Sequence, residues 1–431
     1  MRIILTVFAL GILAILTIKY VFSGSKYTNY LTKSFWTICS IVFIAAMIAQ
    51  PQIVFEGSVK GLETWFEIVL PSLLPFFIAS ELLMAFGVVH FMGILLEPVM
   101  RPLFNLPGSG SFVLAIGFTS GFPIGAVVTA KLRQQRLCTR IEAERLICFT
   151  NNSSPLFMLV AVAVGMFHNQ ELGLIIAGAH YLASLTLGVA LRFYGRKDKE
   201  AIGPSYSAEN ILKRAIRQML KVQSRENRPV GRIISDVVKN SVTNLLTIGG
   251  FIILFAVLIR IFTNTGVIHL MGEFFGIILT PLGMSPDLLQ SLGSGFWEMT
   301  LGTKSASETT APLLQKLVAV AMILGWGGLS VHAQVAGMIA DTDIRIYPFV
   351  ISRSVHACIA ALYTYILAGP AYNKTVALVQ PVFATFGQQV TVSPVANLLF
   401  SFTLLAIIIV LLFAIAVMLC LLKTIKSTIY K

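Results

Sequence analysis

Charged residues are scarce in this chain. Only 12% of its 431 residues are Asp, Glu, Lys or Arg, about half of the roughly 25% that is usual in soluble domains. Hydrophobic residues make up 56% of the chain, and the mean hydropathy is +0.83. This composition excludes a soluble enzyme with a single anchor. It predicts an all-α polytopic membrane protein, whose partner is the lipid bilayer.

Cysteine is also scarce, and its spacing indicates neither a zinc site nor a disulfide framework. The five cysteines are Cys39, Cys138, Cys148, Cys358 and Cys420. We therefore expect no metal and no cofactor. The chain lacks His-Glu-x-x-His, Gly-x-Ser-x-Gly and paired-aspartate signatures, which disfavours an intramembrane enzyme.

Acidic residues are fewer than basic ones, with 19 Asp and Glu against 32 Lys and Arg, which gives a formal net charge of +13. The excess Lys and Arg concentrate in short loops, as expected of cytoplasmic loops in membrane proteins, so we expect no nucleic-acid partner. The segment 192–232 is the extreme case, with eleven basic and four acidic residues. Within it, apolar residues from Ile211 to Leu220 recur at helical spacing opposite Lys and Arg, which predicts a basic amphipathic helix on the inner leaflet.

The stretch Gly117–Ala126 lies between two apolar runs, 111–116 and 127–132, that are each too short to cross a bilayer. Two half-length helices that meet at a Gly/Pro/Ser/Thr tip predict a re-entrant hairpin over 111–136. Bare backbone at membrane depth is tolerated only where it is buried in protein or lines a wet cavity. The tip is therefore a candidate binding site.

The rest of the chain divides into five parts. They are N-terminal transmembrane helices (1–67), a first repeat (68–191), a basic cytoplasmic linker with its amphipathic helix (192–239), a second repeat (240–368) and a C-terminal part (369–431). In the first part we expect an uncleaved first span at 2–22, a second at 34–50 and an outer loop at 51–67. In the last part we expect an outer loop at 369–393, a span at 394–422 and a cytoplasmic C-terminus.

In the first repeat we expect a span at 68–89, a short broken stretch at 90–110, the hairpin, a helix at 141–168 interrupted at 150–155, and a span at 172–191. In the second we expect a span at 240–263, a broken stretch at 264–286, a hairpin at 287–316, a helix at 317–340 interrupted at 325–330, and a span at 344–368. Thr139 and Glu142 are expected to form a capping box.

The two repeats share landmarks in register. Ser120-Gly121-Phe122 matches Ser294-Gly295-Phe296, and 26 residues separate the serine of each helix break, Ser154 or Ser330, from a histidine in each half. Loop charge places the first hairpin opening at the cytoplasm and the second outside. The sequence thus predicts an inverted repeat with two re-entrant hairpins and two broken helices, and sites near the midplane.

Six segments carry a resemblance to the YlbJ sporulation integral membrane protein family, whose Bacillus members are also called SpoVV. They are Pro98–Gly108, Gly117–Ala126, Glu144–Leu146, Phe149–Pro155, Ala179–Tyr181 and Arg192–Gly195. The resemblance implies a nucleoside-recognition, or gate, domain with a plan similar to concentrative nucleoside transporters. It also implies transport of dipicolinic acid across the outer forespore membrane of a sporulating bacterium.

Binding a flat aromatic dianion in a low dielectric requires N–H donors, helix N-termini or a cation, and a surface for the ring. The candidate residues are Thr119, Ser120, Phe122, Asn151, Asn152, Ser153 and Ser154 from the first half, and Ser294, Phe296, Glu298, Thr303, Ser330, Gln334 and Arg353 from the second. Each Ser or Thr could equally serve helix–helix packing.

Arg353 is an intramembrane cation that could grip a carboxylate or pair with Glu81 or Glu298. Glu298 could instead pair with Lys304. His180 and His356 could relay protons or simply bond a neighbouring helix. Besides transport of dipicolinate, a small-molecule anion, nucleoside transport and a non-transporting gate or scaffold subunit stay open, as does a homo-oligomer.

Overall fold

The computed structural model describes residues 26–155, 157–195 and 211–370, and all regular structure in them is helical. Four helices there are long and apolar enough to cross a membrane, and two bent helix pairs raise that number to as many as six. The all-α membrane fold expected from composition is thus confirmed.

The first half runs from α2 to α9. Its helices are α2 (Lys26–Ala49), α3 (Pro51–Thr64), the π-helix η1 (Trp65–Val69), α4 (Leu70–Ala85), α5 (Val88–Phe104), α6 (Gly110–Ser120), α7 (Ile124–Gln134), α8 (Arg140–Thr150), the π-helix η2 (Phe157–Met166) and α9 (Glu171–Leu191). The second half follows α10 (Ile211–Gln223) and contains α11 (Val230–Asn264), α12 (Val267–Leu279), η3 (Pro286–Leu288), α13 (Leu289–Trp297), α14 (Met299–Glu308), α15 (Leu313–Trp326), α16 (Gly328–Ile339) and α17 (Tyr347–Ala368).

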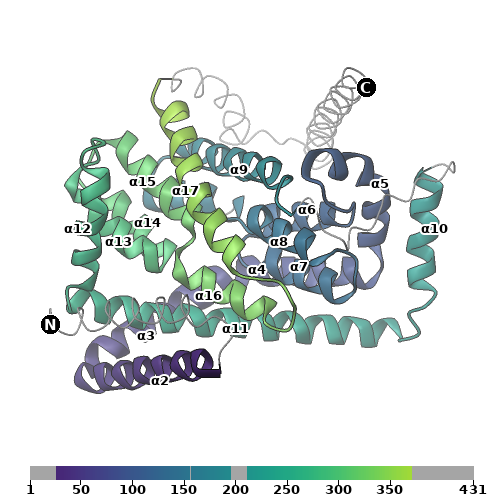
Figure 1. The fold of residues 1–431 in the computed structure, drawn as a ribbon, viewed down its shortest axis with the longest axis horizontal. Coiled ribbons are helices and arrows are strands. Elements are labelled where there is room, and N and C mark those ends of the chain that lie inside the picture. Colours follow the sequence, from purple (N-terminus) through teal and green to yellow (C-terminus); the bar gives the residue numbers. More distant parts are fainter. Residues whose placement is uncertain (1–25, 156, 196–210, 371–431) are drawn as a thin grey trace, which may run out of the picture.

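The same turn recurs in the two halves. Gly87 joins α4 to α5 with φ 75°, and Gly266 joins α11 to α12 with φ 77°. A left-handed conformation at each turn favours glycine because it has no Cβ. Figure 1 shows α5 at the right-hand end of the molecule and α12 at the opposite end, both running across the long axis of α11. The corresponding helices of the two repeats thus lie at opposite ends of the molecule.

Both hairpins and both broken helices are confirmed. The first hairpin is α6–α7, with its tip at residues 121–123, and the second is α13–α14, with its tip at Glu298. The second tip therefore lies four residues beyond Ser294, the landmark that we matched to Ser120. The break after α8 spans 151–154, and α15 and α16 are separated at Gly327. The Thr139–Glu142 capping box is present and starts α8.

Four expected boundaries are wrong. Residues 51–67, expected as an outer loop, form α3 and part of η1, bent by 103° from α2. The expected broken stretches 90–110 and 264–286 contain the helices α5 and α12. The span expected at 240 begins at Val230, so α11 takes up ten residues of the linker. In each case a few charged or turn residues in an otherwise helical stretch suggested an interruption, although packing on other helices compensates for such residues.

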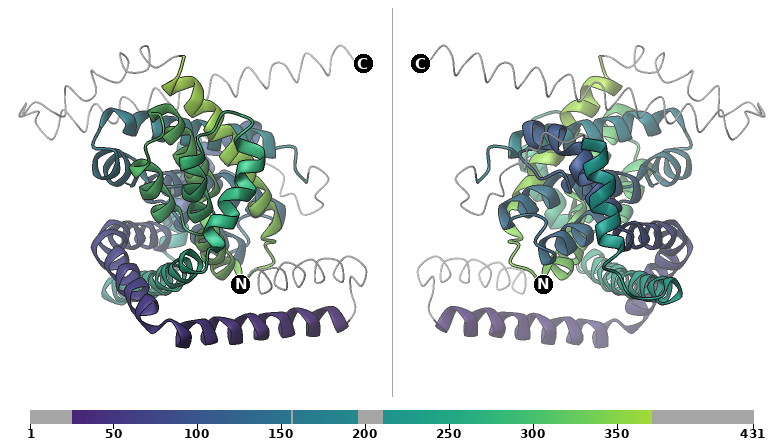
Figure 2. Two further views of the ribbon diagram at one scale, coloured as in Figure 1. Left: turned by 90° about the vertical axis from the view of Figure 1, so that its left-hand side faces the viewer. Right: turned by 90° about the vertical axis from the view of Figure 1, so that its right-hand side faces the viewer.

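Two glycines let α3 pack closely on the long helix α11. A Cβ on Gly57 would lie 3.1 Å from the Cα of Val257, and one on Gly61 would lie 2.8 Å from the Cα of Ile253. Small residues four apart allow such backbone approach between membrane helices. Figure 2 shows α3 crossing α11, with α2 extending away from the bundle.

The amphipathic helix is confirmed as α10. It packs against α5, with Ala215 buried and with Gln223 Nε2 donating to the carbonyl of Phe86 at 3.0 Å. Figure 1 shows α10 at the same end as α5, nearly perpendicular to α11. The spans expected at 2–22 and 394–422, most of the loop 369–393, the C-terminus and Cys420 lie outside the described residues.

Candidate functional site

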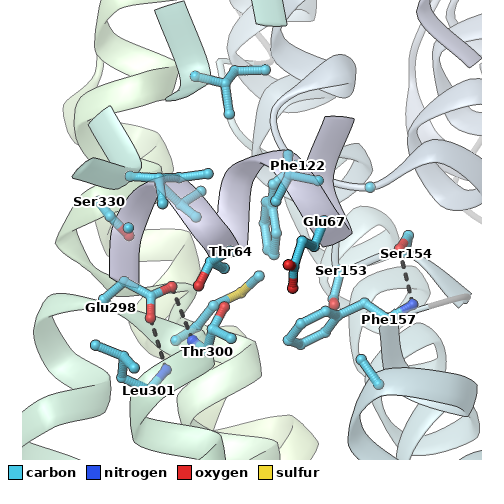
Figure 3. Close-up of a pocket in the computed structure, with 18 of the residues that line it drawn as sticks. Thr64, Glu67, Phe122, Ser153, Ser154, Phe157, Glu298, Thr300, Leu301 and Ser330 are labelled. Atoms are coloured by element: carbon cyan, nitrogen blue, oxygen red, sulfur yellow. Dashed lines mark hydrogen bonds between the residues drawn. The ribbon is translucent and has the colours of Figure 1, made fainter. Parts of the chain in front are cut away.

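One cavity of about 650 Å³ receives residues from both hairpin tips and both helix breaks. Ser120 and Phe122 come from the first tip, and Glu298 and Thr300 from the second. Ser153 and Ser330 come from the two helix breaks. Figure 3 shows Phe122, Ser153, Glu298, Thr300 and Ser330 around a common space. The volume is typical of small-molecule sites, which span roughly 300–1,000 Å³.

The first-half wall is built on the unwound backbone after α8. The N–H of Phe157 donates to Ser154 Oγ at 3.1 Å, so this serine caps the helix that resumes at η2. The N–H of Ser153 donates to His180 Nε2 at 3.3 Å. Tyr181 Oη donates to the carbonyls of Ser153 and Phe118, both at 2.9 Å. The helix α9 therefore fixes the first hairpin and the break together.

The second-half wall centres on Glu298. Its carboxylate accepts from the N–H groups of Thr300 at 2.9 Å and Leu301 at 2.8 Å, and so caps the N-terminus of α14 (Figure 3). The pairing with Lys304 suggested as an alternative is not formed, because Lys304 Nζ lies 4.0 Å from Glu308. A carboxylate at a helix N-terminus is stabilised by the N–H groups and the dipole. It also places an acid beside the cavity.

The third wall of the cavity comes from α3 and η1, although the sequence pattern predicted a loop over residues 51–67. Lys60 and Thr64 of α3 and Glu67 of η1 line the cavity. Lys60 Nζ lies 3.2 Å from Glu63 on the same helix. The spacing Gly57-x-x-x-Gly61 was the available signal, since it is typical of close helix packing in membranes.

Arg353 lies behind the cavity wall and is fully buried. Its Nη1 donates to the carbonyl of Asn151 and its Nη2 to that of Leu324, each at 3.2 Å. Both carbonyls sit at helix breaks, one in each half, where intrahelical donors are missing. Its guanidinium lies 5.4 Å from the ring centroid of Phe122.

Neither acid suggested as a partner for Arg353 contacts it. Glu81 contacts Lys131 of the first hairpin, and Glu298 caps α14. Gln334 lines the cavity from α16.

The two matched histidines meet at the interface between the halves. The ring centroids of His180 and His356 are 4.5 Å apart, and His356 Nε2 lies 3.0 Å from the carbonyl oxygen of His180. That carbonyl only accepts, so His356 carries its proton on Nε2. His180 accepts through Nε2 from Ser153, so its own proton is on Nδ1. A proton relay between them stays a prediction.

The remaining candidates lie outside the cavity wall. Thr119 is exposed and donates to the carbonyl of Ala115 at 2.9 Å, while Asn152 Nδ2 bonds the carbonyl of Phe149 and the hydroxyl of Ser184. Phe296 stacks on Trp326 at 5.3 Å between centroids. Ser294 lies within α13, and Thr303 is buried within α14.

Ion pairs gather at the end of the molecule where α5 lies. Arg101 bonds Glu97 at 2.8 Å and Glu142 at 2.5 Å. Arg133 of α7 bonds Asp343 through Nε at 2.8 Å and Nη2 at 2.7 Å, and this guanidinium holds the pKa of Asp343 below its usual value. The Arg133–Asp343 pair joins the first hairpin to the segment before α17.

Two dipping hairpins and two broken helices around one cavity form the arrangement in which secondary transporters place substrate sites. The chain is thus an integral, multi-pass membrane protein with a transporter-like core. It belongs to the YlbJ family of sporulation integral membrane proteins. It is 46% identical over 350 residues to the sporulation integral membrane protein YlbJ of Bacillus subtilis (strain 168), covering 81% of this chain and 85% of that protein.

Three further comparisons found similar proteins. The family model "Gate: Nucleoside recognition" matches residues 66–170. An uncharacterized protein of Alkalihalophilus pseudofirmus is 33% identical over 118 residues, or 26% of each chain. The solved structure of CNTnw in an inward-facing substrate-bound state covers 83% of this chain and 90% of its own, with 14% identity and a TM-score of 0.37. A score of that size does not by itself establish a common fold.

Proposed function

We propose that this protein is a transporter that moves a small aromatic dicarboxylate, dipicolinic acid, across the outer forespore membrane during endospore formation. The observation that carries the proposal is that both hairpin tips and both helix breaks line one cavity. The proposed orientation places α10, its basic residues and the C-terminus in the cytoplasm, following loop charge. Membership of a sporulation protein family supports the physiological setting.

The cavity offers a surface for a flat ring and neutral hydrogen-bond donors. Phe122 and Phe157 are aromatic residues in its wall, and the hydroxyls of Ser120, Ser153 and Ser330 surround them. Aromatic walls with a few polar groups are typical of small-molecule sites. Unwound backbone lining such a cavity is tolerated at membrane depth, which explains the two breaks.

A nucleoside is the second candidate, and Glu298 favours it. This carboxylate occupies the N–H groups of α14 that could otherwise bind an anion. A carboxylate accepts bonds from the hydroxyls of a neutral sugar but repels a dianion. The family model that matches residues 66–170 is described as nucleoside recognition.

Uptake into proteoliposomes that contain only this protein tests the proposal. We expect labelled dipicolinate to accumulate faster than in empty liposomes, and unlabelled dipicolinate to compete better than a panel of nucleosides. Repeating the assay with and without a proton gradient identifies the coupling. Competition by nucleosides alone would favour the second candidate, and binding without movement would indicate a gate or scaffold subunit that needs a partner.

Glu298→Gln distinguishes the two candidate substrates, because it should strengthen the binding of a dianion but not that of a nucleoside. Removing a negative charge roughly 8 Å from a bound anion, at an effective dielectric constant near 20, relieves about 2 kcal/mol of repulsion per charge pair. We therefore expect dipicolinate to bind at least about 30-fold more tightly, since Gln can still cap α14. Calorimetric titration in detergent measures this change. Glu308→Gln, on an exposed residue of the same helix, is the control. Unchanged or weaker dipicolinate binding would contradict a dianionic substrate.

A further inference from the structure

Arg353 is a buried cation without a counter-ion among the described residues. Its two hydrogen bonds go to backbone carbonyls, which carry only partial charge. Its Nε, fully buried, has no partner. A guanidinium has five N–H donors, and the two bonds use two of them. Burying an unpaired charge costs several kcal/mol, so this arrangement is retained for a reason other than stability.

Three buried or half-buried acids of the described helices that could be considered as counter-ions are engaged elsewhere. Glu81 contacts Lys131, Glu144 bonds Arg345 at 2.7 Å, and Glu298 bonds two N–H groups of α14. A rearrangement of one of these side chains therefore cannot supply the missing negative charge without breaking another contact. Among the residues that the structure describes, no acid pairs with Arg353, so a solute anion is the natural source of the missing negative charge.

Unpartnered donors surround the same place. The side chain of Asn151 is fully buried with neither its nitrogen nor its oxygen bonded, and its own carbonyl is the one that binds Arg353. The hydroxyls of Ser120 and Ser153, both buried, also lack partners. Buried polar atoms in native proteins are nearly always bonded, so a cluster of exceptions indicates a missing ligand or water.

Phe122 lies between the cavity, which Ser120 and Ser153 also line, and the Arg353 guanidinium, which does not line it. Its ring lines the cavity, lies over the Arg353 guanidinium at 5.4 Å, and is only 8% exposed. The ring reaches Gly327, where a Cβ would lie 3.5 Å from Phe122 Cζ. Phe122 thus bridges the first hairpin tip and the second helix break, and moving its ring connects the cavity to Arg353.

We infer that Arg353 and Asn151 form an occluded carboxylate subsite, which Phe122 closes off from the cavity and whose entrance carries the unpartnered hydroxyls of Ser120 and Ser153. A rigid dicarboxylate first enters the cavity and then displaces the ring, so that one carboxylate takes the free edge of the guanidinium. Such side-on contacts form two parallel charge-assisted bonds. This inference rests on the proposed function for its substrate class, whereas the charge preference of the subsite is independent of transport.

Asn151→Asp tests the subsite, with Asn152→Asp as the matched control. The new carboxylate at 151 supplies the missing counter-ion beside Arg353. We expect the Tm to rise by about 3–6 °C and dipicolinate binding to fall at least 100-fold. Asn152 instead uses its amide to donate to a carbonyl and a hydroxyl, so Asn152→Asp should lower the Tm. A lower Tm in both variants, or unchanged dipicolinate binding in Asn151→Asp, would overturn the inference.

Sodium formate provides a probe that does not depend on the transported substrate. We expect formate to raise the Tm of the wild type more than sodium chloride does at equal ionic strength, and this difference to vanish in Asn151→Asp. Phe122→Ala should speed dipicolinate association about tenfold in stopped-flow measurements, whereas Phe157→Ala, in the same cavity, should not. Equal rates in both variants would refute the lid. Formate stabilisation without dipicolinate uptake would leave the subsite standing and refute only the proposed function.

Discussion

Replacing Gly117 with alanine will prevent the protein from being recovered in a folded state. A Cβ at this position would lie 2.1 Å from the carbonyl oxygen of Thr150 and 3.1 Å from its carbonyl carbon. Both atoms are backbone, so no side-chain rotation relieves the clash. Overpacking in a dense interior costs roughly 1–3 kcal/mol and more where backbone must shift. We expect a loss above about 3 kcal/mol, because the hairpin would separate from the break after α8.

The matched control is Gly178→Ala, in α9. A Cβ there meets nothing within 4 Å. Alanine is the better helix former, by about 1 kcal/mol in an exposed position. The yield of monodisperse protein in detergent and the Tm should therefore fall sharply for Gly117→Ala and stay level or rise for Gly178→Ala. Equal behaviour of the two variants would show that the first hairpin does not pack on α8 as described.

Local signals in the sequence located the hairpins and breaks because each one depends on few residues. The tip Gly121-Phe122-Pro123 separates two short apolar runs, and weak helix formers from Asn151 to Ser154 interrupt a helix that would otherwise continue. The capping box at Thr139 is likewise a local pattern. Such features need no knowledge of neighbouring elements, so hydropathy and helix propensity suffice to predict them.

Features that depend on contacts between distant segments were not predictable in the same way. The sequence pattern left open whether Arg353 grips a substrate carboxylate or pairs with Glu81 or Glu298, and it did not indicate that Arg353 bonds two carbonyls at breaks in different halves. Polarity marked residues 51–67 as a loop, although Gly61 packs on α11 and Lys60 lines the cavity. Composition reports what a segment contains, and only the packed structure shows which neighbour compensates for a polar or small residue.

The largest electrostatic effect is expected at Glu144, the acid that joins α8 to α17. It is fully buried and bonds Arg345 through Nε at 2.7 Å and Nη2 at 2.9 Å, and the Tyr194 hydroxyl at 2.8 Å. Glu144→Gln leaves the Arg345 guanidinium without its counter-ion and removes two charge-assisted bonds. Because the Arg345 side chain left behind is 39% exposed, water screens its charge, and we expect a cost of about 1–3 kcal/mol from the lost charged hydrogen bonds. Asp343→Asn provides the contrast, because its bidentate pair with Arg133 is half exposed and should cost under about 1 kcal/mol.

A double-mutant cycle then shows whether this pair also positions the candidate site. Glu144 precedes Asn151 by seven residues and Arg345 precedes Arg353 by eight, so α8 and α17 run side by side in the same direction with two cross-links between them. Arg345→Met leaves the buried Glu144 carboxylate with the Tyr194 hydroxyl at 2.8 Å and Arg140 at 3.8 Å, so it should destabilise at least as much as Glu144→Gln. The double variant should recover about 1–3 kcal/mol relative to the sum. If Glu144→Gln also weakens dipicolinate binding while Asp343→Asn does not, the Glu144–Arg345 pair sets the position of Arg353 relative to Asn151. Additive effects of Glu144→Gln and Arg345→Met on stability would show that these two side chains are not coupled.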